Sequence, residues 1–250
     1  MRIVFDTHVH LYPFYDLELL LASAHRQLSG IAPAADLRVL CLTERTGQTS
    51  FEALAQGRMS APGWTIGGTA DPALLSARAT DGRTLSLLAG RQLIAAERIE
   101  VLVLGADLRL DDGLPARDIL ARIREAGAVA VLPWGLGKWL GQRGNLISNL
   151  LESAQPGDFA LADTYLLPAL APRPGPLRAA SARGFRVLAG TDPLPKPGEE
   201  KLAGRYGVLA EAEVDPANHG PSLRRVLGDP SVRLQTVGRR GSLPELLRAF

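Results

Sequence analysis

The sequence has little of what disulfide frameworks or membrane spans require. Cys41 is the only cysteine among 250 residues, so no disulfide can form within the chain, and its apolar neighbours favour a small buried thiol. No apolar run approaches the ~20 residues of a transmembrane helix. The chain opens on a strand-like segment rather than on an apolar leader. We therefore expect a cytoplasmic protein with no membrane partner.

Charge of one sign is also lacking. The 28 basic and 26 acidic side chains leave a net charge of +2, and no basic stripe carries interleaved aromatic residues, so we expect no nucleic-acid partner. Hydrophobic residues make up 46% of the chain, which is enough for a substantial core. We find no repeat and no clear linker, and we predict a single domain over residues 1–250. Nothing in the sequence indicates an oligomeric state.

Strand-like and helix-like segments alternate along most of the chain, which predicts an α/β fold. The expected strands are 3–6, 37–42, 99–104, 128–132, 159–162, 185–188, 206–212 and 232–236, and the expected helices are 17–28, 50–55, 116–125, 138–154, 177–183, 222–227 and 243–250. Residues 64–98 differ, because four short strands with a hairpin signal at Asp81-Gly82 predict an inserted antiparallel meander.

Polar residues follow the expected strands so regularly that we favour a distorted (β/α)7-8 TIM-like barrel over an open sheet. In barrels the functional residues lie at the carboxyl ends of the strands. The polar and aromatic residues at those ends form the candidate site: His8, His10, Glu44, Arg45, Asp107, Trp134, Asp163 and Asp192.

The most informative motif is Asp6-Thr7-His8-Val9-His10, directly after the apolar run that begins at Ile3. Side chains alternate along a strand, so both imidazoles point to the same side. The chain has only four histidines, and two of them lie in this motif. Two neutral imidazoles at a strand end are typical of a metal site, with Asp6 behind or beside them.

These residues resemble the PHP family of metal-dependent phosphoesterases, distorted barrels related to the amidohydrolases. Asp6, His8 and His10 match the family's opening Asp-x-His-x-His motif, and Asp192 matches an Asp near its end. Other positions depart from the pattern. Arg45 stands where members have a His, Pro133-Trp134 replaces a His-Pro pair, and Leu194 replaces a final His.

The resemblance leaves two hypotheses open. In the first, His8, His10 and Asp192 hold one zinc, manganese or iron ion, with help from Glu44 or Asp163, and the ion activates water. Asp192 and Asp6 are then the candidate catalytic residues. The substrate is then a small anionic molecule, a phosphate ester rather than an amide or a lactone. In the second hypothesis the site is eroded, holds no metal, and binds a ligand or partner without turnover.

Four further residues are candidates for substrate binding. Arg45 can clamp an anion or form a salt bridge, and Trp134 can stack on a planar group or fill part of the cavity. Lys138 follows Gly135 and Gly137 at a predicted helix start, a position suited to an anion. Asp163 can line the pocket or cap a turn.

Overall fold

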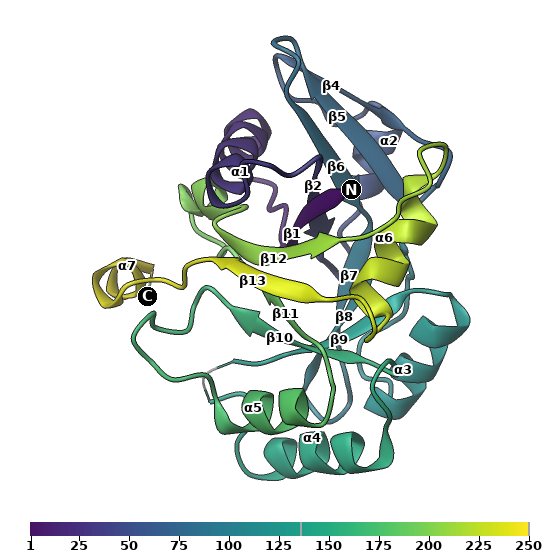
Figure 1. Ribbon diagram of the computed structural model, residues 1–250, viewed down its shortest axis with the longest axis vertical. Coiled ribbons are helices and arrows are strands. Elements are labelled where there is room, and N and C mark those ends of the chain that lie inside the picture. The colour runs from purple at the N-terminus through teal and green to yellow at the C-terminus, as the bar shows by residue number, and fades with distance from the viewer. Residues whose placement is uncertain (136, 250) are drawn as a thin grey trace.

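The computed structural model describes residues 1–135 and 137–249, and its strands form two mixed sheets (Figure 1). The seven-stranded sheet has the order β13 (Leu234–Gly238), β12 (Tyr206–Glu211), β1 (Arg2–Val9), β2 (Leu37–Leu42), β6 (Thr84–Leu88), β5 (Leu74–Ala79) and β4 (Trp64–Gly68). The six-stranded sheet has the order β11 (Val187–Gly190), β10 (Ala160–Thr164), β9 (Val129–Pro133), β8 (Glu100–Leu104), β7 (Gly90–Ile94) and β3 (Glu44–Arg45).

The α/β prediction is confirmed, but the structure does not show the predicted barrel of parallel strands. Strands β9, β10 and β11 are parallel, as are β1, β2 and β6. Strand β8, however, runs antiparallel to both β7 and β9. Only residues 95–99 connect β7 to β8, and so short a connection leaves no room for the crossover that parallel neighbours need.

The two sheets approach each other closely where β1 passes β11. The amide of Asp192 donates to the carbonyl of His8 at 2.8 Å, and a Cβ added to Gly190 would lie 2.6 Å from the His8 nitrogen and Cβ. A second approach lies at the carboxyl end of β2, where a Cβ added to Gly90 of β7 would overlap the carbonyl oxygen of Leu42. The carboxyl ends of strands from both sheets therefore surround a common region.

The predicted meander is present in part. Strands β4, β5 and β6 are antiparallel neighbours, and Gly82, in the turn between β5 and β6, has a positive φ of 86°, which glycine adopts at little cost. The fourth expected strand, β7, belongs to the other sheet and pairs in parallel with β3. The meander is therefore an edge of the seven-stranded sheet, and β7 carries the chain to the second sheet.

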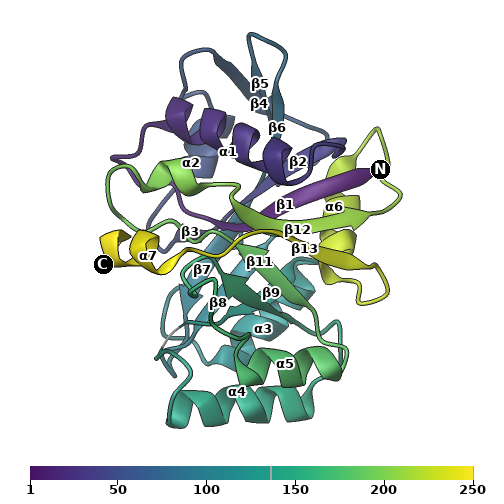
Figure 2. The same ribbon diagram turned by 60° about the vertical axis from the view of Figure 1, so that its left-hand side comes forward.

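Helices cover the outer faces of the sheets. Helix α1 (Leu17–Ile31), whose first turn is capped by the Asp16 carboxylate on the Leu19 amide, packs beside β1 and β2. Helices α3 (Ala116–Glu125), α4 (Gln142–Ser153) and α5 (Gly175–Ala182) lie together beside the six-stranded sheet (Figure 2). The remaining helices are α2 (Ser50–Ala55), the 3-10 helix η1 (Glu199–Leu202), α6 (His219–Gly228) and α7 (Leu243–Ala249).

A central core lies between the two sheets, and residues from both contribute to it, among them Phe5, Leu102, Leu188 and Val208. Cys41 is buried in the same core as a free thiol, and burial raises its pKa, which confirms the expected packing role. Among the described residues, no helix combines the length and apolar character that crossing a bilayer requires. Phe250, the end of the predicted last helix, lies outside the described residues.

Candidate metal centre

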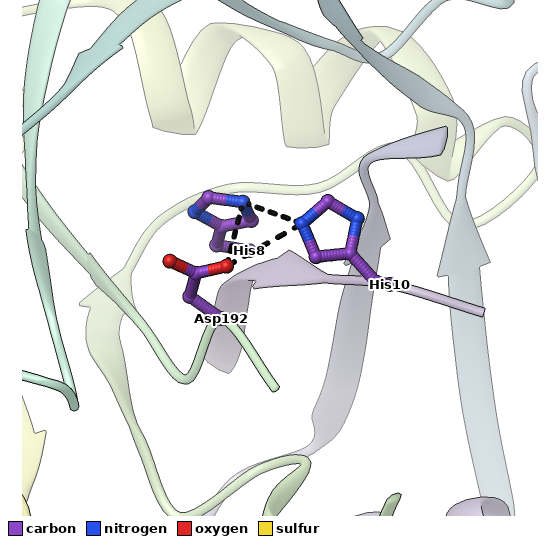
Figure 3. A group of neighbouring side chains, drawn as sticks. All are labelled: His8, His10 and Asp192. Atoms are coloured by element: carbon purple, nitrogen blue, oxygen red, sulfur yellow. Dashed lines mark hydrogen bonds and ion pairs between the residues drawn. The ribbon is translucent and has the colours of Figure 1, made fainter. Parts of the chain in front are cut away.

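Three side chains from distant parts of the sequence converge at the carboxyl ends of β1 and β11. His8 and His10 come from the end of β1, and Asp192 from the segment after β11 (Figure 3). The Nε2 atoms of the two histidines lie 3.1 Å apart, and each lies 3.4 Å from Asp192 Oδ1. Their ligand atoms all lie within 4.8 Å of one another. The structure therefore brings together the three residues on which the sequence prediction rests.

Asp192 reaches this position through an unusual backbone conformation. Its φ is 51°, in the left-handed region that residues other than glycine seldom adopt. The hydrogen bond from its amide to the carbonyl of His8, at 2.8 Å, holds the segment against β1. Conformations of this kind cost ~1 kcal/mol or more and cluster at functional sites, so the geometry favours a functional role for the carboxylate.

The protonation states of the cluster suit a cation. Burial lowers the pKa of His8, although the nearby Asp192 carboxylate opposes this effect, and the ring therefore offers a neutral nitrogen. Burial opposes ionisation of Asp192, but the attraction of the His8 ring when it is protonated and the hydrogen bond from His10 outweigh burial and hold the pKa of the carboxyl below its usual range. Two imidazoles and a carboxylate are a common donor set for zinc, manganese or iron.

Gln92 adds a fourth polar atom that sequence reasoning missed. This residue of β7 is buried, and its Oε1 lies 3.1 Å from His8 Nε2. Three polar atoms thus surround His8 Nε2, one each from His10, Gln92 and Asp192, and the ring can donate a proton to only one of them. The lone pairs that remain unshared repel one another unless a positive ion lies between them. The residues present therefore fit a divalent metal, although the buried His10 Nδ1 has no partner among the described residues, unlike most metal-binding histidines.

Asp6, a candidate catalytic residue, lies behind the cluster. Its carboxylate accepts hydrogen bonds from the Thr191 amide and hydroxyl, the Gly204 amide and the His8 amide. Burial raises the pKa of Asp6 to about 6, even though these hydrogen bonds favour the ionised form. The carboxylate ties the end of β1 to the end of β11 and so positions His8.

Glu44, the fourth predicted ligand, does not join the cluster. Its Oε1 accepts the Phe51 amide of helix α2 at 2.7 Å, and its Oε2 lies 3.4 Å from Arg91 Nη1. Glu44 and Arg91 are paired in the β3–β7 register, and paired residues share one face of a sheet. That face is opposite to the one on which Gln92 lies, so the carboxylate of Glu44 points away from the histidines.

Asp163 also lies apart from the three ligand residues. Its buried carboxylate pairs with Arg240 and accepts a hydrogen bond from the Tyr206 hydroxyl at 3.1 Å. Arg173 lies 3.7 Å away on the same oxygen. Asp163 thus fixes the segment after β13 against β10, and its neighbour Thr164 contacts the cavity instead.

A cavity of about 290 Å³ opens beside the cluster. Its lining includes His10 and Asp192 together with three of the predicted substrate-binding residues, Arg45, Trp134 and Lys138. Because the cavity is open beside it, Trp134 is a wall residue and does not fill the space. The lining also includes Glu100, whose carboxylate accepts two hydrogen bonds from Lys138 Nζ, both at 2.7 Å.

Sequence reasoning missed Glu100 because of the direction it assumed for β8. It assumed that β8 runs parallel to its neighbours and that its functional residue follows its end, at Asp107. Since β8 is antiparallel, its first residue lies at the cavity and its end lies elsewhere, where Asp107 pairs with Arg91 and Arg109. No residue pattern within the strand signals its direction.

Comparison with known proteins supports the fold but no family assignment. The sequence matches no protein-family model and no curated protein. The structure is similar to PsfC from Pseudomonas syringae PB-5123, with a TM-score of 0.58 and 19% identity over 98% of this chain and 94% of PsfC. It is also similar to the lesion-specific endonuclease PfuEndoQ from Pyrococcus furiosus, with a TM-score of 0.53 and 10% identity over 94% of this chain and 58% of PfuEndoQ. At these identities the likeness establishes a shared fold.

Proposed function

We propose that the protein is a metal-dependent hydrolase of a small phosphate ester, with one divalent ion held by His8, His10 and Asp192. The observation that carries this proposal is the convergence of two imidazole nitrogens and a carboxylate oxygen within 4.8 Å beside an open cavity. A bound ion supplies a Lewis acid that polarises the phosphoryl oxygen and eases deprotonation of water.

The residues around the ion have separate tasks. Asp192 lines the cavity. Its carboxylate takes a proton from the attacking water while the oxygen of that water forms the new bond to phosphorus. The bond from phosphorus to the leaving oxygen breaks, and that oxygen receives the proton. Arg45 supports the anionic group from the cavity rim. Asp6 holds His8 and Thr191 in place through the hydrogen bonds described above.

The PHP-type assignment belongs to the same proposal. It draws support from the Asp6-x-His8-x-His10 motif, from the position of Asp192 beside it, and from the fold shared with PfuEndoQ. We also propose that the two sheets together form the distorted barrel of the resembled family. The close approach of β1 to β11 supports this.

The second candidate function is ligand binding without turnover. One observation favours it: Arg45 and Trp134 line the cavity at positions where the resembled family has metal-binding histidines. Such a protein uses the same cavity and gains stability from its ligand by mass action but converts nothing.

Metal analysis separates these two functions. Elemental analysis of the purified protein and calorimetric titration with Mn²⁺ and Zn²⁺ should give about one ion per chain. The His10→Ala variant should lose this binding, whereas His25→Ala, which removes a histidine of helix α1, should keep it. Asp192→Asn should lose most hydrolysis of a phosphate-ester panel.

Two results contradict the proposal. Stoichiometric binding that survives combined His8→Ala and His10→Ala changes places the ion elsewhere. Absence of hydrolysis with manganese, zinc and iron, together with a metabolite that raises the melting temperature, favours the binding protein.

A further inference from the structure

The two cationic side chains that line the cavity differ in their freedom to bind an anion. Lys138 donates to both oxygens of Glu100 at 2.7 Å, so its charge is already neutralised. The guanidinium of Arg45 makes no hydrogen bond or ion pair with any described residue. Its backbone is engaged with Gln48, whose side-chain oxygen accepts the Arg45 amide and whose amide donates to the Arg45 carbonyl. Arg45 is therefore the cation of this cavity that is available to a ligand.

The strand register places Arg45 close to the metal ligands. Arg45 of β3 is the register partner of Gln92 of β7, and partners on neighbouring strands lie ~4.8 Å apart with their side chains on one face. Gln92 in turn contacts His8 at 3.1 Å. An anionic group seated at the His8, His10 and Asp192 cluster therefore lies within reach of the long Arg45 side chain.

The remaining wall of the cavity is largely apolar. Pro133, Trp134, Leu166 and Leu194 contribute to it. Trp134 packs partly on the core beside β9, and its backbone amide donates to the carbonyl of Ala162 at 2.9 Å. The volume of about 290 Å³ is at the low end of ligand pockets, which run from ~300 Å³ upward, and suits a compact group.

Glu100 limits the charge that the ligand can carry. Its carboxylate lies at the cavity rim, and Lys138 compensates only that one negative charge. Glu100 is on the same sheet face as Gln92, because Ile94 is its register partner and Gln92 is two residues before Ile94. A second anionic group on the ligand would therefore find no free cation among the described lining residues beyond Arg45, because Lys138 is already paired with Glu100.

We propose that the ligand of this cavity is a phosphate monoester whose organic part is uncharged, flat and about one ring in size, with its phosphate held by Arg45 and its ring against Trp134. This inference rests on the proposed function for the identity of the anionic group. It adds a substrate class, and it assigns the specificity to two residues that hold no metal.

Non-hydrolysable phosphonates test the proposal by binding alone. Calorimetric titration of the Mn²⁺-loaded protein should show phenylphosphonate binding about tenfold more tightly than methylphosphonate, the size of effect that one aromatic contact gives. Trp134→Ala should reduce this ratio to about threefold or less, and Trp134→Phe should restore most of it. Quenching of tryptophan fluorescence provides a second readout.

The role of Arg45 is tested with one variant and a matched control. Arg45→Met should weaken both phosphonates by roughly tenfold or more, as expected when a charged hydrogen bond is lost, and should keep the ratio between them. Arg117→Met removes an exposed arginine of helix α3 and should change neither affinity.

The outcomes separate this inference from the proposed function. Equal affinity for the two phosphonates, or a ratio that persists in Trp134→Ala, overturns the inference, even if the wild type hydrolyses glycerol phosphate. A ring preference that depends on Trp134 supports it. If neither phenyl phosphate nor glycerol phosphate is then hydrolysed, the proposed function fails and the ligand class stands.

Discussion

Replacing Gly190 by alanine tests the contact on which the whole site depends. Gly190 ends β11, and a Cβ there would lie 2.6 Å from both the nitrogen and the Cβ of His8, and 3.1 Å from its Cα. Ordinary contacts of a Cβ begin at about 3.4 Å. The neighbouring atoms belong to the backbone or to the root of the side chain, so no flexible group can move aside. Strands β1 and β11 must therefore separate by several tenths of an ångström or more.

The expected cost has two parts. Overpacking of this kind destabilises a core by ~2–3 kcal/mol, which for a chain of this size lowers the melting temperature by roughly 4–12 °C. The separation also shifts His8 relative to Asp192, whose amide bonds to the carbonyl of His8. Metal sites tolerate deviations of only about 0.2 Å, and loss of a positioning contact typically lowers metal affinity ~10–100-fold.

The assay pairs thermal unfolding with Mn²⁺ titration, and Gly30→Ala is the matched control. Gly30 lies in helix α1 with no atom within 4 Å of the added Cβ. Alanine there should raise stability by up to ~1 kcal/mol through helix propensity and leave metal affinity unchanged. A Gly190→Ala protein with the wild-type melting temperature would refute the close approach of β1 to β11.

Two further variants probe the residues that the structure places outside the cluster. Glu44→Gln should cost ~1–3 kcal/mol in urea unfolding, because the buried contact with Arg91 loses its negative charge, and should leave Mn²⁺ affinity unchanged; a tenfold loss of affinity would restore Glu44 as a ligand. Burial raises the pKa of Tyr206 to about 12, above that of an unfolded tyrosine, so its contribution to stability is complete below pH 10 and is lost as the pH rises through 12. Between pH 9 and 12 the Tyr206→Phe variant should therefore lose ~2 kcal/mol less stability than the wild type. Identical pH profiles of the two proteins would contradict this.

The part of the site that follows from local sequence was predictable. Alternation along β1 sets the direction of His8 and His10, and a strand followed by Asp192 places that carboxylate at the carboxyl end of its own strand. These inferences need only the residue pattern, whereas the meeting of the ends of β1 and β11 depends on the close approach of the two sheets.

The unpredicted part depends on pairings between distant strands. Whether Glu44 faces the histidines is decided by its register with Arg91, and a shift of one residue would have turned it towards them. Glu100 reaches the cavity because β8 is antiparallel to β7, and Gln92 through the register of β7 with β3. Apart from Glu100 itself, β8 is apolar and has the same pattern in either direction, so the sequence holds no local signal for the position of Glu100.

The pairing of β1 with late segments has a consequence for how the protein is made. The Asp6 carboxylate accepts hydrogen bonds from the hydroxyl of Thr191, 185 residues later in the chain, and from the amide of Gly204, 198 residues later. Strand β12 pairs with β1 across a similar separation. At a synthesis rate of about 5–20 residues per second, this interval lasts roughly 10–40 s. During that time the strand bearing both histidines has one edge without its final partner, exposed to other chains. The His8, His10 and Asp192 cluster can therefore be complete only after β11 has been synthesised, and a nascent chain that stalls before β11 carries the histidine pair without its carboxylate.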